Sequence, residues 1–267
     1  VNLSFLANAS YVKNEIKNLG NQTGYIDKES LPTLGTVSRN QNGYPIGYFF
    51  GYKAIGVFQT QEEIDNYISP ATGKPIQPNA VPGDTKFEDL NGDGVISDDN
   101  EDRTMIGKPN PDWIVGLTVA ADWNGFDLSA FFQGSFGADV FDALRRYELA
   151  AVNYTSDALE RWTGPGTSNS MPRIVLGDTP KNFRPSTLLV HDASFLRLRN
   201  LQVGYTLPAQ LTRKAYIQRL RFYASFDNLL TITGYKGMDP EIGSTMGIDK
   251  GVYPQARVYT FGLNLTF

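Results

Sequence analysis

The sequence contains no cysteine and only one histidine, His191, in 267 residues. The absence of cysteine excludes a disulfide scaffold, thiolate catalysis and every cysteine-ligated metal site. A single histidine excludes metal centres built from several histidines, and it makes a histidine-based catalytic triad a weak hypothesis. Because Asp192 and Ser194 are too near His191 in the sequence to form such a triad readily, we interpret it as a surface-loop residue.

Charge is also scarce, and positive charge does not predominate. Charged residues make up 19% of the chain, and 24 Lys and Arg against 28 Asp and Glu give a formal net charge of −4. A nucleic-acid-binding protein needs basic surface to neutralise phosphates, so we expect no nucleic acid partner. No apolar run is long enough for a membrane-spanning helix. A transmembrane β-barrel remains compatible, because its polar interior gives it the hydropathy of a soluble protein.

Aromatic residues, by contrast, reach 12%, and many lie in segments of about ten residues where apolar and polar side chains alternate. This period of two predicts β-strands with one apolar and one polar face. The predicted strands are Val1–Tyr11, Val115–Trp123, Phe126–Phe136, Phe195–Thr206, Arg219–Leu229 and Val258–Phe267. In the fourth strand the alternation changes phase, which predicts a β-bulge near Arg199–Asn200.

The two faces are expected to meet different environments. The apolar sets, such as Tyr259, Phe261 and Leu263, would contact lipid. The polar sets would line a lumen: Asn2, Ser4, Asn8, Asp127, Ser129, Gln133, Arg219, Arg221 and Asp227.

The connections between these strands alternate in length. Asn124-Gly125 is the favoured dipeptide of a type I′ hairpin. The long connections are expected at about 14–111, 138–193 and 231–253, and such asymmetry is typical of outer-membrane barrels, whose long loops are extracellular. Asn42–Phe58 could be a further crossing, but strand parity favours an extramembrane hairpin. Helical spacing of apolar residues predicts short loop helices at Phe141–Leu149 and Asp157–Trp162.

The predicted fold class is therefore all-β, a portion of a large antiparallel transmembrane β-barrel with about six strands, a seventh or eighth being left open. Single-chain barrels start at eight strands, and lipid does not tolerate open sheet edges. We therefore expect the sequence to be part of a larger barrel, or to close with other chains. The alternative is a secreted, calcium-stabilised β-sandwich that binds glycans or acts as a glycosidase. Alternation that continues to Phe267 favours the barrel.

The sharpest local motif is an EF-hand-type calcium loop at 89–102. Side chains of Asp89, Asn91 and Asp93 and the carbonyl of Val95 would bind calcium, with Asp102 as the expected last ligand, because Asn100 stands at the twelfth position where the pattern has Glu. Between residues 84 and 102 there are eight Asp and Glu against one Lys, a self-repelling cluster without a cation. The alternative is a solvated acidic turn.

A second pair of carboxylates occurs in Asp239-Pro240-Glu241. A glycosidase needs an acid/base pair across a cleft, and spatial pairing is not visible in one sequence. A simple loop turn after a strand is the favoured interpretation of this motif.

Several segments together resemble the SusC/RagA-like TonB-dependent outer-membrane transporters of Bacteroidetes. They are Gly43-Tyr44-Pro45-Ile46-Gly47, Gly83-Asp84 leading to Asp89–Gly94, Ile106-Gly107-Lys108-Pro109-Asn110-Pro111, Ala193–Asn200 running to Gly204–Pro208, Asn228-Leu229-Leu230, Tyr235-Lys236-Gly237, Asp239-Pro240-Glu241 and Thr260–Phe267. Their order and spacing extend over nearly the whole chain.

The resemblance implies the C-terminal part of a barrel of about 22 strands in the bacterial outer membrane, without its plug domain. It further implies energised uptake of oligosaccharides or peptides rather than an enzyme activity. The implied partners are the rest of the barrel and its plug, a SusD-like surface lipoprotein, and TonB with ExbB and ExbD, reached through a segment outside this sequence. The calcium-type loop is implied to be extracellular.

Overall fold

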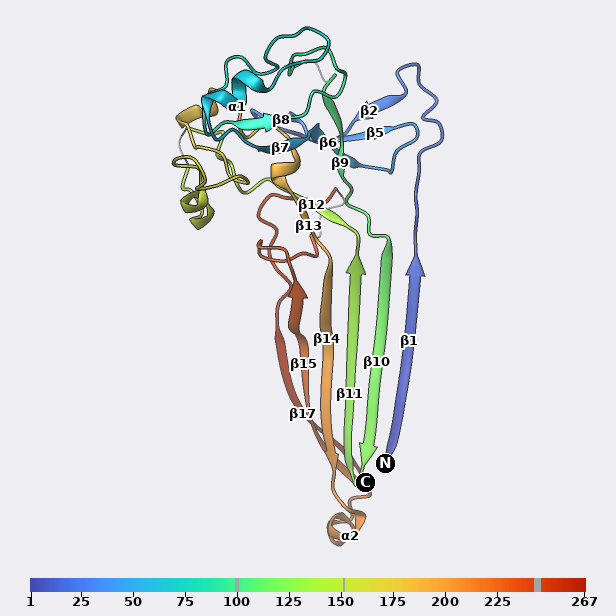
Figure 1. Cartoon of the computed structure of the whole chain (residues 1–267). Helices are drawn as coiled ribbons and strands as arrows, with labels where there is room; N and C mark the ends of the chain where they lie inside the picture. The colour runs from blue at the N-terminus through green and yellow to red at the C-terminus, as the bar shows by residue number, and fades with distance from the viewer. Residues whose placement is uncertain (99–100, 151, 243–245) are drawn as a thin grey trace.

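A computed structural model describes residues 1–267 except 99–100, 151 and 243–245. Six long strands form one antiparallel sheet in the order β1-β10-β11-β14-β15-β17. These are β1 (Asn2–Tyr11), β10 (Trp113–Trp123), β11 (Phe126–Phe136), β14 (Phe195–Thr206), β15 (Arg219–Thr233) and β17 (Val258–Thr266). Figure 1 shows them as a tall, narrow sheet, with a layer of small elements at one end and both termini near the other.

The strand register joins the apolar side chains into one continuous face. One row across the sheet runs Ala7, Leu117, Phe132, Leu198 and Leu230, each paired with the next. This face is exposed rather than covered: Phe261, for example, has 76% of its surface accessible. A β-sandwich would bury these residues against a second sheet, so the sandwich interpretation is wrong and the all-β barrel-type sheet is confirmed.

The opposite face of the sheet is polar. The adjacent row runs Asn8, Gly116, Gln133, Arg197 and Thr231. Because side chains alternate along each strand, one register places every predicted apolar set on one face and every predicted polar set on the other. We call the latter the polar face.

The predicted bulge in β14 is present. Leu198 and Asn200 pair with the adjacent residues Phe132 and Phe131 of β11, so Arg199 is the extra residue. On the other side, the register of β14 with β15 is also interrupted between Leu198 and Asn200. The extra residue brings the two halves of β14 back into phase with their neighbours, as a bulge is expected to do.

Short connections lie at the end of the sheet opposite the small elements. Asn124 and Gly125 have φ values of 47° and 87°, as a type I′ turn requires. The aromatic rings beside this turn are close together: Phe126 lies 6.4 Å from Trp123 and 4.4 Å from Tyr205, measured between centroids. The second short connection contains α2 (Ala209–Thr212) and η4 (Arg213–Ala215).

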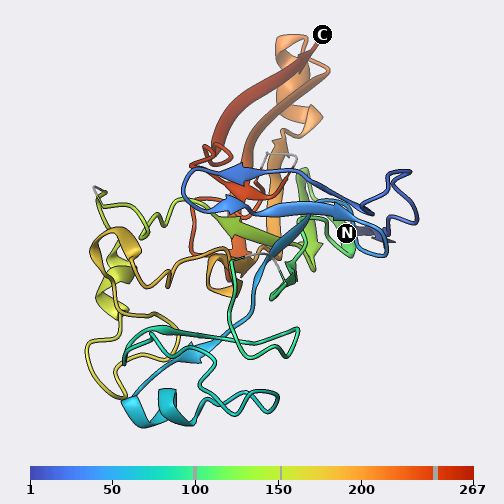
Figure 2. The same ribbon diagram turned by 90° about the horizontal axis from the view of Figure 1, so that it is seen from above.

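The long connections build the layer of small elements at the other end, which we call the loop layer (Figures 1 and 2). Its strands and helices are β2 (Tyr25–Asp27), β3 (Ser30–Leu31), β4 (Gly35–Thr36), β5 (Ser38–Gln41), β6 (Tyr48–Tyr52), β7 (Ala54–Val57), α1 (Gln61–Asn66), β8 (Thr85–Phe87), β9 (Arg103–Gly107), β12 (Asp139–Asp142), η1 (Ser156–Glu160), η2 (Leu176–Asp178), η3 (Thr187–Leu189), β13 (Val190–Asp192) and β16 (Ile248–Asp249).

The buried core of the chain lies in this layer. Val37, Phe49 and Phe141 have no accessible surface and pack in one cluster with Leu189 and Ile248. The cluster brings residues of all three long connections together, so burial of apolar surface makes them one packed unit.

Three sequence expectations have different outcomes here. Asn42–Phe58 forms β6 and β7 in the loop layer and not a further long strand. It is not the expected hairpin either, because β6 pairs with β5 and β9 whereas β7 pairs with β8. Phe141–Leu149 was expected to be helical and is not: Phe141 belongs to β12, which pairs with β13 and β16. Strand pairing and burial of Phe141 override the helical spacing. In Asp157–Trp162 the expected helix is a 3₁₀ turn, η1.

Guanidinium groups stacked on aromatic rings stiffen the loop layer. Arg39 lies between Tyr25 and Phe50, with its Cζ 4.1 Å and 3.6 Å from the ring centroids. Arg103 covers Phe50, 4.3 Å from its centroid. Such contacts are worth about 0.5–2 kcal/mol each, depending on burial, so they fix the small sheet β2-β5-β6-β9.

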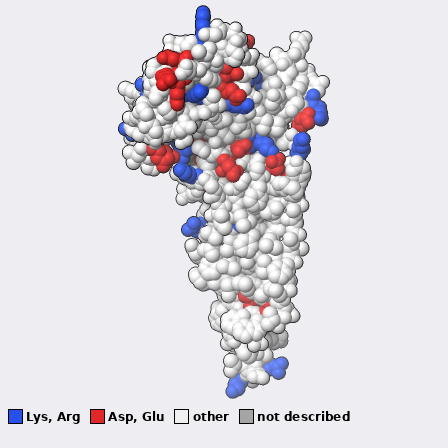
Figure 3. Space-filling model, viewed as in Figure 1, with Lys and Arg blue, Asp and Glu red and all other residues white. Residues whose placement is uncertain are grey.

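Among the described residues, no helix is both long and apolar enough to cross a membrane. Figure 3 shows that charged side chains on the face in view gather over the loop layer and at the tip near α2, and that the strands between carry few.

The two faces should tolerate charge differently. We expect Phe261→Arg to destabilise the folded barrel by about 2–4 kcal/mol, the cost of Arg on a lipid-facing midplane position. Thr260→Arg, on the polar face opposite Ser225, is the matched control and should cost less than about 1 kcal/mol. Unfolding of the full-length protein in detergent or lipid measures both, and equal costs would contradict the assigned faces.

Candidate functional site on the polar face and in the loop layer

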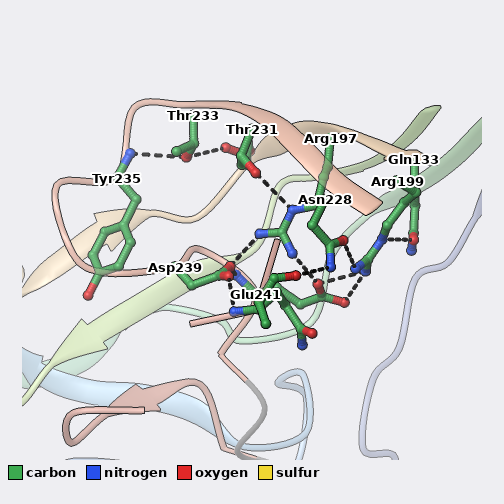
Figure 4. A network of polar contacts seen from close by, with 12 residues as sticks. Gln133, Arg197, Arg199, Asn228, Thr231, Thr233, Tyr235, Asp239 and Glu241 are labelled. Atoms are coloured by element: carbon green, nitrogen blue, oxygen red, sulfur yellow. Dashed lines mark hydrogen bonds and ion pairs between the residues drawn. The ribbon is translucent and has the colours of Figure 1, made fainter. Parts of the chain in front are cut away.

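The polar face carries a buried ion-pair network near the loop layer, shown in Figure 4. Arg197 of β14 has a side chain only 2% exposed. Its Nη2 donates to Asp239 Oδ1 at 2.5 Å and its Nη1 to Glu241 Oε2 at 3.0 Å. Its Nε donates to Thr231 Oγ1 at 2.9 Å. All three guanidinium nitrogens therefore donate hydrogen bonds, two to the loop and one to the neighbouring strand.

The bulge residue Arg199 completes the network. Its Nη2 donates to both carboxylate oxygens of Glu241 at 2.6 Å, and its Nε donates to Gln133 Oε1 at 2.7 Å. Its Nη1 reaches Asn228 Oδ1 at 3.2 Å. Without the bulge, alternation would place Arg197 and Arg199 on the polar face and Asn200 on the apolar face. The extra residue keeps all three on the polar side.

The network positions the connection between β15 and β17. Asp239 Oδ2 accepts the backbone N–H of Gln255 at 2.9 Å, and its Oδ1 accepts that of Glu241. Since Arg197 and Arg199 project from the polar face, the segment around Asp239 lies over that face. We call Arg197, Arg199, Asp239 and Glu241 the loop clamp. Sequence reasoning interpreted Asp239-Pro240-Glu241 as a simple turn and missed the clamp; the signal was the Arg-x-Arg at the phase change.

The clamp also bears on the glycosidase alternative. Both carboxylates of Asp239-Pro240-Glu241 are bound by guanidinium groups rather than facing each other across an open cleft, which an acid/base pair needs. Their arrangement serves to hold a loop.

A second ion pair lies at the far end of the polar face. Arg221 of β15 donates through Nε to Asp127 Oδ1 of β11 at 2.9 Å, reaching over β14. Beside the loop clamp, at the other end of the face, Asn200 of β14 donates to Asp227 of β15 at 2.7 Å. The predicted polar set therefore forms cross-strand contacts along the inner wall of the sheet.

His191 lies in β13, where Arg145 Nη1 is 3.1 Å from its Nε2 and Asp142 Oδ2 is 3.7 Å away. Burial, and next the Arg145 cation, lower the pKa of His191 below its usual value. The ring is consequently neutral at pH 7. Ser194 instead binds the backbone N–H of Gly137, so these residues form no nucleophilic arrangement.

The acidic loop is folded tightly by its own side chains. Asp89 accepts the N–H groups of Gly92 and Gly94 at 2.8 and 2.9 Å, and Asp93 accepts that of Val95 at 2.8 Å. Gly94 has a φ of 89°, a conformation that favours glycine.

Asp102 joins the two ends of this loop. It has no accessible surface, and its two oxygens accept the N–H groups of Leu90 and Ser97 at 3.1 and 3.0 Å. Asn91 turns its amide nitrogen toward Asp93 and Glu101. Asn100 lies outside the described residues. In the part of the chain that the structure describes, no three His, Cys, Asp or Glu side chains converge in a metal-ligating group, and calcium stays a prediction.

Comparison with known proteins gives consistent similarities. No family model matches the chain. TonB-dependent receptor P3 of Formosa agariphila is 34% identical over 238 residues, 85% of this chain and 23% of that protein. TonB-dependent receptor SusC of Bacteroides thetaiotaomicron is 30% identical over 263 residues, 97% of this chain and 24% of that protein. The chain thus spans about a quarter of the length of the curated relatives it matches.

Solved structures agree. The RagAB peptide transporter aligns with 99% of this chain and 27% of its own chain, with a TM-score of 0.73 and 27% identity. The RagAB peptide importer in its open-open state gives a TM-score of 0.70 and 28% identity over 99% of this chain and 26% of that one. These relatives are receptors and transporters, which confirms the expectation that the chain does not belong to an enzyme.

The loop clamp should control how firmly the β15–β17 connection is held. We expect Arg197→Met to speed hydrogen exchange of the amides of Glu241 and Gln255 at least tenfold, because a carboxylate buried without its partner costs about 3–5 kcal/mol. Arg257→Gln, an exposed arginine of the same connection, is the control. Unchanged exchange in Arg197→Met would contradict the assigned role.

Calcium binding makes a separate prediction for the full-length protein. Chelation with EGTA should lower Tm by several degrees, and Asp89→Asn combined with Asp93→Asn should remove that response. Glu62→Gln, an exposed acid in α1, should leave it intact. Metal analysis of the purified protein should give one equivalent of calcium, and an EGTA-insensitive, calcium-free protein would leave the acidic turn as the correct interpretation.

Proposed function

Since the chain belongs to the SusC/RagA-like TonB-dependent receptors, we propose that it forms part of an outer-membrane transporter that imports oligosaccharides or peptides. The observation that carries this proposal is the sheet itself. It has one exposed apolar face and one polar face, joined by a continuous register over six strands. A wall between lipid and an aqueous lumen needs both.

The sheet edges favour further barrel strands as partners. In the described residues, β1 pairs only with β10 and β17 only with β15, so each leaves one side unpaired. In lipid each unsatisfied backbone group costs several kcal/mol. The remaining strands of the same transporter are therefore proposed to pair with β1 and β17, and its plug to occupy the lumen beside the polar face.

The polar face and the loop clamp support a role in the transport path. Arg197 and Arg199 hold the β15–β17 connection over what would be the lumen, on the side of the loop layer. In the proposed transporter the connection would lie between external cargo and the plug. Energy would reach the plug through TonB, ExbB and ExbD, which would engage a segment outside this chain.

The loop layer is the proposed docking region for a SusD-like surface lipoprotein. It lies at the end of the sheet away from the short turns (Figure 1), which is the extracellular end in outer-membrane barrels. The acidic loop, with calcium bound by Asp89, Asn91, Asp93, the Val95 carbonyl and Asp102, would be a structural element of this layer.

Uptake in a strain that encodes the full-length receptor tests the proposal. Deletion of the gene should abolish uptake of the cognate labelled oligosaccharide or peptide, and a plasmid copy should restore it. A copy without the TonB-binding segment should assemble in the outer membrane and fail to transport. Uptake by that copy at the wild-type rate, or by energy-depleted cells, would refute energised transport.

A plasmid copy carrying Arg257→Gln serves as the matched control and should transport normally. The lipoprotein partnership is tested separately by hydrogen exchange on the purified pair. Protection should concentrate in the loop layer, and protection confined to the α2 end would contradict the proposed docking side.

A further inference from the structure

The loop layer contains a cavity of about 690 Å³. It lies between residues 72–80, 94–96 and 179–184. Its volume is in the range of sites for small ligands. It is separate from the loop clamp, none of whose residues line it.

Two amide side chains of the cavity lining, the half-buried Gln77 and the buried Asn182, bind the backbone of β8. Gln77 donates to Thr85 O at 3.1 Å and accepts the Phe87 N–H at 2.8 Å. Asn182 accepts the Thr85 N–H at 2.8 Å and has only 1% of its surface exposed. Two lining segments, one of them 97 residues along the chain from Thr85, are thereby tied to β8, and these contacts hold the cavity wall without a ligand.

Gly94 of the acidic loop lies in one wall of the cavity, where its backbone packs closely against Ser69 and Thr72. A Cβ at this position would lie 2.7 Å from Ser69 Oγ and 2.9 Å from Thr72 Oγ1. With a φ of 89°, the position requires glycine for both space and backbone conformation. The acidic carboxylates of Asp89 and Asp93 do not line the cavity.

The lining is cationic in a chain that is acidic overall. Lys74, Lys181 and Arg184 line the cavity against a single carboxylate, Asp84. Asp84 is already bound, by Arg173 at 2.6 Å and by Asn182 at 3.1 Å.

The three cations differ in how they are held. Lys181 pairs with Asp98, which lies outside the lining. The Arg184 guanidinium lies 4.8 Å from the centroid of Tyr52 and 4.9 Å from that of Phe87, which keeps it at the cavity. The Lys74 ammonium is on an exposed residue. Asp98 also lies 3.8 Å from Arg184 Nη1, so this one carboxylate faces two of the three cations, and the lining keeps an excess of positive charge.

The lining also indicates how a ligand would be recognised. No aromatic residue lines this cavity among the described residues, so stacking of a neutral sugar on a ring is not its mode. We propose that the cavity binds a carboxylate-bearing segment of the cargo, held by Lys74, Lys181 and Arg184. This inference rests on the proposed transport function and narrows its substrate class to anionic cargo.

Two sources supply that chemistry, a uronic-acid oligosaccharide and an acidic peptide. Calorimetry on the full-length receptor, at fixed calcium, would use trigalacturonate and tri-aspartate as probes. Their uncharged counterparts are methyl-esterified trigalacturonate and tri-asparagine. At least one charged probe should bind, and its uncharged counterpart should bind at least tenfold more weakly, because charge-assisted hydrogen bonds are about twice as strong as neutral ones.

Variants then locate the binding. Lys74→Gln combined with Lys181→Gln should weaken the charged probe at least tenfold, and Lys74→Arg combined with Lys181→Arg should retain it. Lys28→Gln, an exposed lysine of the loop layer that does not line the cavity, is the matched control.

The inference fails if neither charged probe binds, if the uncharged counterpart binds equally well, or if the glutamine variants bind like the control. The comparison of probes needs no variant, so misfolding of a variant cannot rescue the idea. If receptor-dependent uptake persists but no anion binds, the cavity assignment is refuted and the transport proposal stands. If energised uptake is lost while anion binding is intact, the transport proposal is refuted and anion binding by the cavity stands.

Discussion

The backbone hydrogen-bond ladder across six antiparallel strands is the constraint on which the rest of this structure depends. In lipid, backbone N–H and C=O groups find no water, so each must be paired within the protein. Once the ladder fixes the register, alternation leaves no freedom: Leu117 and Phe132 must share one face, and Gly116 and Gln133 the other. The fold and the location of the polar face both follow from this pairing.

The one interruption of the ladder is where the β15–β17 connection is held against the polar face. The extra residue Arg199 breaks the register of β14 and leaves two arginines, Arg197 and Arg199, on the polar face. Their charges would be unfavourable there without partners, and Asp239 and Glu241 arrive from the following connection to neutralise them. A local defect in the sheet thereby specifies where a distant loop must lie.

Much of the sheet could be predicted because its signal is local. The strand Phe195–Thr206 and its bulge follow from the parity of Leu196, Leu198, Leu201 and Val203 alone, and Asn124-Gly125 specifies its own turn. The loop layer could not be predicted in the same way. Phe141 has helical spacing with Leu144, yet β12 forms because β13 and β16 pair with it, and those partners are about 50 and 107 residues away in the sequence. The clamp was missed for the same reason, since Arg197 and Asp239 are brought together only by the fold.

Buried ion pairs are weak evidence for stability, because desolvation offsets much of their Coulomb attraction. The loop clamp is therefore better explained by the position it gives the loop than by a gain in stability. Apolar residues at the same positions could pack the β15–β17 connection against the wall, but they would not fix where along the wall it sits. Arg197 binds Asp239 and Glu241 at the same time, and Arg199 binds both oxygens of Glu241; only one placement of the loop satisfies all of these contacts. The contribution of the clamp is therefore positional. The same reasoning applies to Arg39 and Arg184 in the loop layer, where stacking on aromatic rings determines where each cation lies without a matching buried carboxylate having to do so.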